Sequence, residues 1–434
     1  MSKKLIAPLY MHSFRCLGGD CEDTCCQNWD ISIDKYHYDL LLNKVENNQE
    51  DKALFERSVL LHKPENSSEK NYAYIQKQAS GFCPFYTGQG LCHIHARYGV
   101  EPLNDTCTFF PRVLSEREEV VELTAALSCP EVVRQCLMSD QKQQVMQEVD
   151  QDILPRSDFP VARVIDEPEN CYAEKFQEVR AAMIELMNDD EYSFEARLYF
   201  LANFGYRLSS HYHQGCDSNL RVDEEIKRIK SKEIRNQLDD YYFNFSNEEP
   251  IAIVVIQAIL QLRIQHEGND KLSQMAKQIL DKYRVNYERS EDFDVYGENI
   301  PPDILARAYQ QHWDNLNTNY GVTLEEYFSR YVINCLQREW FVSMPDPFTY
   351  IQMLIIRVAV LRFLITSHPD IITLMKSNDV NGQQLDKFNN KIVEIVYLYA
   401  RSIDHNLTFL QVVYQAMLEQ QMMTFDYSMA FIKF

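Results

Sequence analysis

Residues 16–26 read CLGGDCEDTCC, and residues 83–92 read CPFYTGQGLC. With Cys107 these stretches place seven thiols between positions 16 and 107, and nine of the chain's twelve cysteines fall in its first 136 residues. Thiols gathered in one region indicate a disulfide framework or a site for a soft metal, and the redox compartment decides between the two.

The compartment is expected to be reducing. The first residues resemble the charged end of a signal peptide, but the apolar run from Leu5 to Met11 is short, contains Pro8 and precedes no small-residue cleavage site. No stretch has the roughly 18 uncharged apolar residues of a membrane span. The nearest one, Ile351 to Ile365, carries two arginines. We therefore expect a cytoplasmic protein with no membrane partner, whose thiols are free or metal-bound. Secretion would instead make disulfides the default.

Composition limits the classes of function. The 434 residues are 45% hydrophobic, which suffices for two to three packed domains, and the net charge of −21 disfavours binding to nucleic acids or anionic membranes. A cationic substrate or partner is compatible with this charge. Only 12 glycines occur, and no G-x-G-x-x-G, P-loop or G-x-S-x-G motif is present. A doubly wound nucleotide-binding sheet is therefore disfavoured.

The chain is predicted to be mainly α, with a cysteine-rich, loop-rich metal-binding unit packed on an irregular all-helical domain. The unit covers residues 1–147, a proline-containing linker covers 148–170, and the helical domain covers 171–434 with a break near 296–302. No fixed-period repeat is visible, which disfavours a solenoid.

Helical spacing of apolar residues defines the second part. It predicts an amphipathic helix from Phe176 to Met187, a mostly buried helix after Pro250, and further helices over 347–367, 385–401 and 407–423. Thr323 and Glu326 form a capping-box pattern that predicts the start of another helix.

The predicted metal ligands are seven thiols: Cys16, Cys21, Cys25, Cys26, Cys83, Cys92 and Cys107. Zinc sites usually show repeated C-x2–4-C pairs, and only the first three of these cysteines have such spacing. The wide, uneven spacing of the later ones favours an iron–sulfur cluster, with zinc as the alternative. Which four thiols share a metal is left open, and Cys26 is also a candidate packing residue.

Local sequence supports ligand duty for these thiols. The tripeptide Asp-Thr-Cys occurs at residues 23–25 and again at 105–107, and it favours side-chain-capped turns that aim N–H groups at a sulfur. His93 and His95 are spare candidate ligands, although a hydrogen-bonding role is the more common one for a histidine. Asn28 stands where a C-x3-C-x2-C radical cluster would need a cysteine, so radical chemistry is disfavoured.

The order of these motifs resembles a known family. The run from Phe14 to Asp34, then Cys83-Pro84-Phe85, Gly90-Leu91-Cys92, residues 107–112 and residues 127–131 are similar to the flagellin lysine N-methylase family. The cysteine part also resembles a broader group of cysteine-cluster domains expected to chelate zinc or iron. The resemblance covers residues 8–135 and is weaker over the helical remainder.

The resemblance implies an enzyme, a protein-lysine N-methyltransferase of the bacterial flagellum. It would move a methyl group from S-adenosylmethionine to lysine ε-amines of flagellin, and it would bind an iron–sulfur cluster, 4Fe–4S in type. Sequence reasoning names no catalytic base, no donor-binding residue and no oligomeric state. Two alternatives stay open: a metal-stabilised module that binds a protein without catalysis, and a redox or metal-handling protein.

Overall fold

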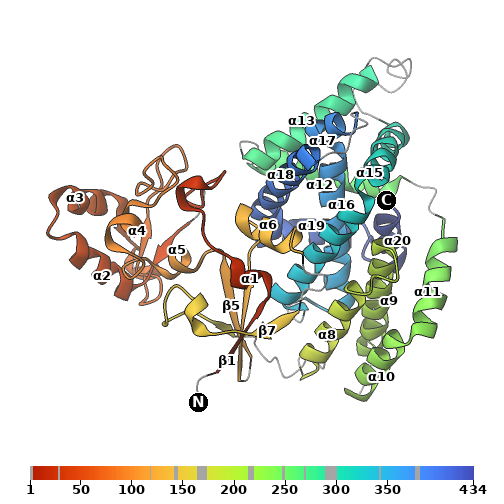
Figure 1. Ribbon diagram of the computed structural model, residues 1–434, viewed down its shortest axis with the longest axis horizontal. Helices are drawn as coiled ribbons and strands as arrows, with labels where there is room; N and C mark the ends of the chain where they lie inside the picture. Colours follow the sequence, from red (N-terminus) through yellow and green to blue (C-terminus); the bar gives the residue numbers. More distant parts are fainter. Residues whose placement is uncertain are drawn as a thin grey trace. The chain divides into compact units, whose positions relative to one another are not determined.

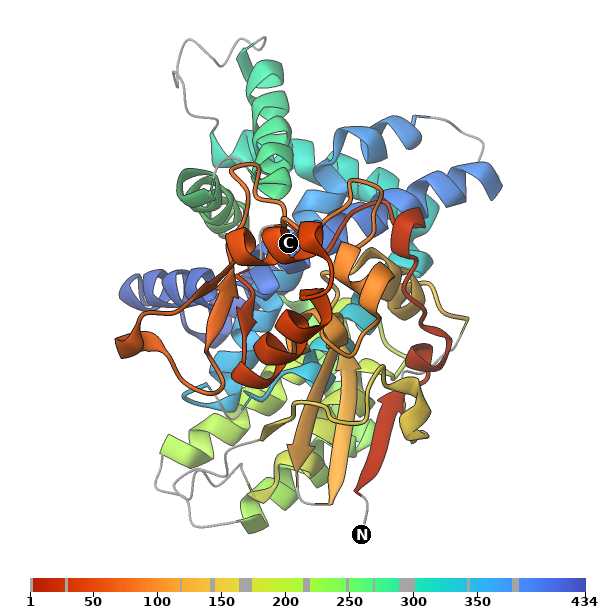
Figure 2. The same ribbon diagram turned by 90° about the vertical axis from the view of Figure 1, so that its left-hand side faces the viewer.

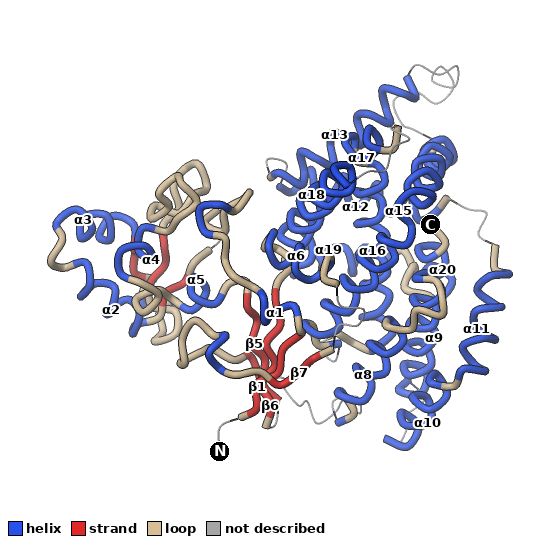
Figure 3. The backbone as a smooth tube through the Cα atoms, in the orientation of Figure 1, coloured by secondary structure: helices blue, strands red, loops and turns tan. Residues whose placement is uncertain are grey.

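The computed structural model describes residues 3–27, 30–117, 119–140, 145–163, 174–213, 219–246, 250–267, 270–288, 301–341, 344–376 and 382–434. The chain divides into two compact units. The first comprises Met1–Gln135 and Val145–Val164, and the second comprises Cys136–Gln144 and Ile165–Phe434. Helices predominate, which confirms the mainly α class (Figure 3). The described part of the predicted linker contributes a 3-10 turn and a strand to the first unit.

A five-stranded sheet forms one part of the first unit. Its strands are β1 (Lys4–Pro8), β5 (Arg112–Arg117), β6 (Val120–Ala125), β7 (Met146–Glu148) and β8 (Ala162–Arg163), in the order β7-β1-β6-β5-β8. β5 and β6 pair antiparallel, whereas β1 runs parallel to β6 with Lys4 opposite Val120. Figure 2 shows red β1 beside the orange strands. Sequence analysis did not predict this sheet, and the run from Leu5, weighed there as a signal peptide, begins it.

A smaller sheet and short helices form the other part of the first unit. The elements are β2 (Ser32–Ile33), α2 (Lys35–Val45), α3 (Gln49–Ser58), β3 (Val59–Leu61), β4 (Ala73–Ile75), α4 (His93–Tyr98) and α5 (Asp105–Phe109), with strand order β2-β4-β3. α1 (Tyr10–Ser13), α6 (Pro130–Leu137) and 3-10 turns at Gly18–Asp20, Pro64–Asn66 and Gln151–Ile153 complete the unit's elements. The core between them contains Val45, Phe55 and Ala73, and Cys83 and Cys92 pack against it.

All the secondary-structure elements described in the second unit are helices (Figure 1). Its helices are α8 (Phe176–Met187), α9 (Phe194–His213), α10 (Asn219–Lys230), α11 (Lys232–Asn244), α12 (Ile251–Glu267), α13 (Lys271–Glu288), α15 (Pro302–Arg338), α16 (Pro347–Ser367), α17 (Pro369–Leu374), α18 (Gly382–Tyr399), α19 (Leu407–Glu419) and α20 (Phe425–Ile432). A π-helical segment, Ala400–Asp404, directly follows α18.

α16 is the central helix of this unit and packs against α9, α15 and α20. Within the described residues it alone is long and apolar enough to cross a membrane, and all of that apolar stretch is buried inside the protein. Asp346 caps its first turn by accepting from the N–H of Thr349 at 3.0 Å. Burial on every face explains why α16 lacks a polar stripe.

Several predicted helices are confirmed and one boundary is wrong. α8 and α16 begin and end within the predicted ranges, and α12 starts after Pro250 as expected. Thr323 does not start a helix, because it lies inside the 37-residue α15, where buried Tyr320, Leu324 and Phe328 continue the apolar contacts through it. The predicted break at 296–302 lies mostly outside the described residues, and α15 begins at Pro302.

Candidate functional site

Backbone pairing joins the first two cysteine segments. The N–H of Cys83 donates to the carbonyl of Cys26 at 2.8 Å, and Gln27 pairs with Phe82 in an isolated antiparallel bridge. The loop that leaves Cys83 returns at Cys92, which lies in a second such bridge and immediately precedes α4. These contacts place Cys26 beside Cys83, and they bring the returning arm of the loop to the same part of the unit.

Glycines let the two cysteine loops touch through their backbones. Gly90 has a φ of +77°, and a Cβ added to it would lie 2.7 Å from the Cα of Gly19. Gly18 has a φ of +55° and faces the side chain of Leu91. Since no Cβ fits between the loops, and since positive φ strains other residues, glycine is required at Gly90 on both counts.

Gly90→Ala is therefore expected to separate the two loops. The cost should be about 2–3 kcal/mol of unfolding free energy, because the strain of positive φ and the clash with Gly19 add. Gly88→Ala is the matched control, since Gly88 has a φ of +78° but open space around its Cβ position. Thermal unfolding of both variants measures the difference. Equal losses in the two would contradict the close approach.

The thiols of Cys25, Cys26, Cys83, Cys92 and Cys107 act on one another electrostatically. The hydrogen bond that the Cys25 thiol donates to Cys26 and burial together raise the pKa of Cys25, and the same bond lowers the pKa of Cys26 to about 7. Burial, with smaller contributions from Cys26 and Cys92, raises the pKa of Cys83 to about 12. Burial likewise raises the pKa of Cys107 despite a hydrogen bond from Asn104, and Cys92 adds to this rise.

Cys129 also belongs to this region, and it was not among the predicted ligands. It immediately precedes α6, whose Arg134 donates to Glu22 at 2.6 Å, and Ser13 donates to Gln135 of the same helix at 2.9 Å. The segment that contains Cys16 and Cys21 is thus tied to α6 at both of its ends.

The thiols of Cys16, Cys21 and Cys129 form a second group that adjoins the first. Burial, with smaller contributions from the thiols of Cys21 and Cys16, raises the pKa of Cys129 to about 12, although N–H groups at the start of α6 oppose this rise. Cys16 also raises the pKa of Cys25. The signal that pointed to Cys129 was the dipeptide Cys129-Pro130, which also occurs at cluster ligands.

All eight cysteine residues from Cys16 to Cys129 are at least partly exposed, although several of their sulfur atoms are desolvated. Free cysteine is ordinarily among the most buried residues, as Cys136 and Cys335 are in the second unit. Partly exposed cysteine residues at this density fit soft-metal ligation better than core packing. Cys171 and Cys216, expected in cores, lie outside the described residues.

Several of the predicted ligands act on one another electrostatically, but they do not form a coordination shell in the described structure. Among the described residues, no three His, Cys, Asp or Glu side chains form a group that could hold a metal ion. The donor set itself is what a soft metal or an iron–sulfur cluster takes, namely thiols from separate segments with N–H donors beside them. Cys25, Cys26, Cys83, Cys92 and Cys107 would hold such a group, and the ligand assignment stays a prediction.

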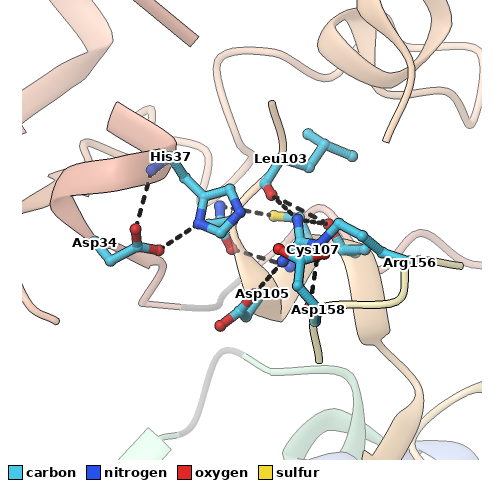
Figure 4. A network of polar contacts seen from close by, with 9 residues as sticks. Asp34, His37, Leu103, Asp105, Cys107, Arg156 and Asp158 are labelled. Atoms are coloured by element: carbon cyan, nitrogen blue, oxygen red, sulfur yellow. Dashed lines mark hydrogen bonds and ion pairs between the residues drawn. The ribbon is translucent and has the colours of Figure 1, made fainter. Parts of the chain in front are cut away.

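The turn that presents Cys107 is fixed by polar contacts (Figure 4). Asn104 caps α5 by accepting from the N–H of Cys107 at 3.0 Å, and its amide donates to the Cys107 sulfur at 3.4 Å. Arg156 pairs with Asp105, donates to the carbonyl of Leu103 at 2.9 Å, and pairs with Asp158 at 2.8 Å. The first tripeptide, at residues 23–25, forms a loop turn instead, in which the hydroxyl of Thr24 accepts from Cys26 N–H.

The histidines of this unit have separate roles. His93 pairs with buried Asp51 at 2.8 Å and His95 is exposed, so the expected hydrogen-bonding role holds for His93. His37, which sequence reasoning missed, is 5% exposed and bound through Nδ1 to Asp34 at 2.5 Å. Its Nε2 has no hydrogen-bond partner within the described part of the chain. The sequence signal that could have indicated this contact is Asp34, a helix-capping residue three positions before His37.

A buried charge cluster lies in the second unit, and we call Arg338, Glu339, Arg357 and Asp404 the Arg357 cluster. Both carboxylate oxygens of Glu339 accept from Arg357, at 2.8 and 2.7 Å, and Arg338 donates to the same carboxylate at 2.7 Å. Asp404 lies in the π-helical segment, accepts from Tyr331 at 2.7 Å, and is 3.7 Å from Arg357.

The two carboxylates of the Arg357 cluster differ in proton affinity. Although burial opposes it, Arg357 and Arg338 lower the pKa of Glu339 to about 2. Burial raises the pKa of Asp404 to about 6, because Arg357 is shared with Glu339 and compensates it only in part. Glu339 is therefore a fixed negative charge, and Asp404 takes up a proton near neutral pH.

A raised pKa makes Asp404 a source of pH-dependent stability. Between the ordinary pKa near 3.8 and about 6, the folded chain binds more protons than the unfolded chain, so stability falls as pH rises through this window. Asp404→Asn removes the ionisation while keeping an acceptor for Tyr331. We expect the variant to be more stable than the wild type at pH 8, by roughly 2–3 kcal/mol, and to match it near pH 4. Urea unfolding across pH measures this, and parallel pH profiles would contradict it.

Comparison with known proteins places the chain. The family model described as the FliB lysine N-methylase C-terminal domain matches residues 180–431. The chain is 29% identical over 131 residues to the flagellar biosynthetic protein FliU of Salmonella muenchen, which covers 30% of this chain and 75% of FliU.

Two further relatives are named lysine-N-methylase, from Salmonella typhimurium and Salmonella choleraesuis. Each is 29% identical over 131 residues, or 30% of this chain, and this match spans 31% of the relative's length. No solved structure matches the chain significantly.

Proposed function

Because the chain belongs to the FliB lysine N-methylase family, we propose that it methylates lysine ε-amines of flagellin with S-adenosylmethionine as donor. The observation that carries this proposal is the match of the family's C-terminal domain to 252 residues of the helical unit, 180–431. The flagellar name of one relative supports flagellin as the partner, and lysine-N-methylase as the name of two others supports the reaction.

This reaction requires a neutral acceptor amine, in-line positioning of the amine and the methyl donor, and exclusion of water. The acceptor lysine must be neutral, although its reference pKa is near 10.4, so the site has to desolvate the amine or place a base beside it. The amine nitrogen then displaces the thioether from the methyl carbon. The N–C bond forms as the S–C bond breaks, and the proton of the amine passes to a base or to solvent. Exclusion of water and in-line positioning of the reactants accelerate the methyl transfer.

We also propose that the N-terminal thiols hold an iron–sulfur cluster. The first thiol group, Cys25, Cys26, Cys83, Cys92 and Cys107, would provide the ligands. Their wide, uneven spacing along the chain supports a cluster over a single zinc, whose ligands usually come in C-x2–4-C pairs. The cluster would brace loops that have little core of their own.

The test is methyl transfer by the anaerobically purified full chain. Flagellin incubated with it and a methyl-labelled donor should carry label on lysine, as peptide mass spectrometry would show. Binding of flagellin without transfer would support the non-catalytic module instead. A colour change on reduction with neither binding nor transfer would support a redox protein.

A further inference from the structure

A lysine of this chain rests on a tyrosine ring in the helical unit. Lys433, at the end of α20, places its Nζ 3.8 Å from the ring centroid of Tyr242 on α11. Burial lowers the pKa of Lys433, and Glu195 of α9 opposes this effect from nearby. Within the described residues Lys433 makes no ion pair, so the ring holds the ammonium in place of a carboxylate. Lysine ammonium groups otherwise extend into water.

Tyr242 belongs to an aromatic group built by three helices. Tyr199 of α9 lies 5.9 Å from Tyr242, 6.3 Å from Tyr241 and 5.8 Å from Phe425 of α20. Tyr241 is 62% exposed, so one flank of this group is open to solvent. A side chain from another protein can therefore reach these rings without unfolding the unit.

A carboxylate and an arginine complete the surroundings. Glu195 pairs with buried Arg362 at 3.3 Å, and its negative charge raises the pKa of Tyr242 after burial has raised it. Glu195 therefore acts electrostatically on both Lys433 and Tyr242, and Arg362 is its counter-charge. A carboxylate in this place can accept the proton that an ammonium must lose before it attacks a methyl group.

Other lysines of the described chain lack this combination. Lys35 lies 5.0 Å from the Tyr72 ring, but its hydrogen bond with Asp39 raises its pKa. Burial lowers the pKa of Lys282, as does repulsion from Lys376, but no ring lies over its ammonium in the described structure. Lys433 combines a ring face, a lowered pKa and a nearby carboxylate.

We propose that the Tyr242 face with Glu195 is the subsite for the acceptor lysine, and that Lys433 occupies it when no target is bound. This inference rests on the proposed function. An aromatic face binds an ammonium and its methylated products alike, because the attraction is to a positive charge. Partial desolvation moves the amine toward the neutral form that the reaction needs.

The binding test uses the full chain and a small amine. Lys433→Ala vacates the subsite, so n-butylammonium should raise the melting temperature of this variant. It should not raise the melting temperature of the wild type. n-Butanol, a neutral molecule of similar size, should not raise the melting temperature of Lys433→Ala. Lys433→Ala/Tyr242→Phe keeps a ring and should keep the response, and Lys433→Ala/Tyr242→Leu should lose it. An equal response in the Phe and Leu variants, or none in Lys433→Ala, would overturn the subsite.

The activity test separates this inference from the proposed function. Lys433→Met should lower KM for flagellin several-fold with kcat unchanged, since an internal competitor is removed. Glu195→Gln should lower kcat and steepen its dependence on pH. If the wild type transfers no methyl group, the proposed function fails, and the n-butylammonium result still decides on ammonium binding. If the wild type is active but neither variant changes KM or kcat, the acceptor subsite is wrong.

Discussion

Cys83→Ser is expected to remove the proposed metal centre of the first unit and to reduce the proposed methyl transfer by at least about 100-fold. Cys83 is the thiol most firmly placed, because its N–H binds Cys26 at 2.8 Å and its side chain packs on the core beside Cys92. A serine oxygen fills the same space but is a poor ligand for iron. Iron content, absorption spectrum and methyl transfer measure the effect.

The control for this prediction is Cys335→Ser in the second unit. Cys335 is fully buried and remote in sequence from the N-terminal thiols, so its loss should leave iron content unchanged. Circular dichroism divides the remaining outcomes. A folded but inactive Cys83→Ser protein indicates a cluster used in the reaction, and a misfolded one indicates a structural cluster. Full iron content in Cys83→Ser would exclude Cys83 as a ligand.

Arg357→Met is expected to cost about 3 kcal/mol of unfolding free energy, the low end for one partner of a buried ion pair. The substitution leaves Glu339 buried with only Arg338 and the hydroxyl of Tyr350 to compensate its charge. Glu339 has a lowered pKa, so its contribution to stability is present above pH 4.5 and is lost as pH falls toward 2. Urea unfolding at pH 7 measures the loss.

The double variant Arg357→Met/Glu339→Gln provides the matched comparison. Removing both charges avoids an unpaired buried carboxylate, so the double variant should recover most of the stability lost by Arg357→Met. If the double variant loses as much unfolding free energy as the Arg357→Met and Glu339→Gln variants lose together, the pair contributes through packing instead of charge.

The helices were predictable where local signals sufficed. Phe176 to Met187 repeats apolar residues on one face, and Asp346-Pro347 starts α16 with a cap and a proline, so the bounds followed from sequence. The predicted helix start at Thr323 was wrong because the residue pattern of a capping box can also occur inside a long helix. Only the contacts of Tyr320 and Leu324 decide between the two cases.

The five-stranded sheet and the charge pairs were not predictable, because they join distant residues. β1 pairs with β6 through Lys4 and Val120, and nothing near Leu5 indicates that partner. Arg357 counted in the sequence only as a charge unsuited to a membrane span. Its role depends on Glu339, which lies before α16 and folds back onto it.

The thiol site was predictable in composition and not in arrangement. Seven clustered cysteines indicated ligands, and the motif order indicated the family. The approach of Cys129 to Cys16 depends on α6 and its bonds to Ser13 and Glu22, which spacing along the chain does not encode.

The central property of this chain is the binding of one inorganic centre by its N-terminal thiols, which we propose. Anaerobic purification of the full chain, followed by its absorption spectrum and by iron, sulfide and zinc analysis, tests this directly. We predict a brown protein with iron and acid-labile sulfide, which Cys83→Ser loses and Cys335→Ser keeps. A colourless protein with neither iron nor sulfide, or with a single zinc, would contradict the cluster.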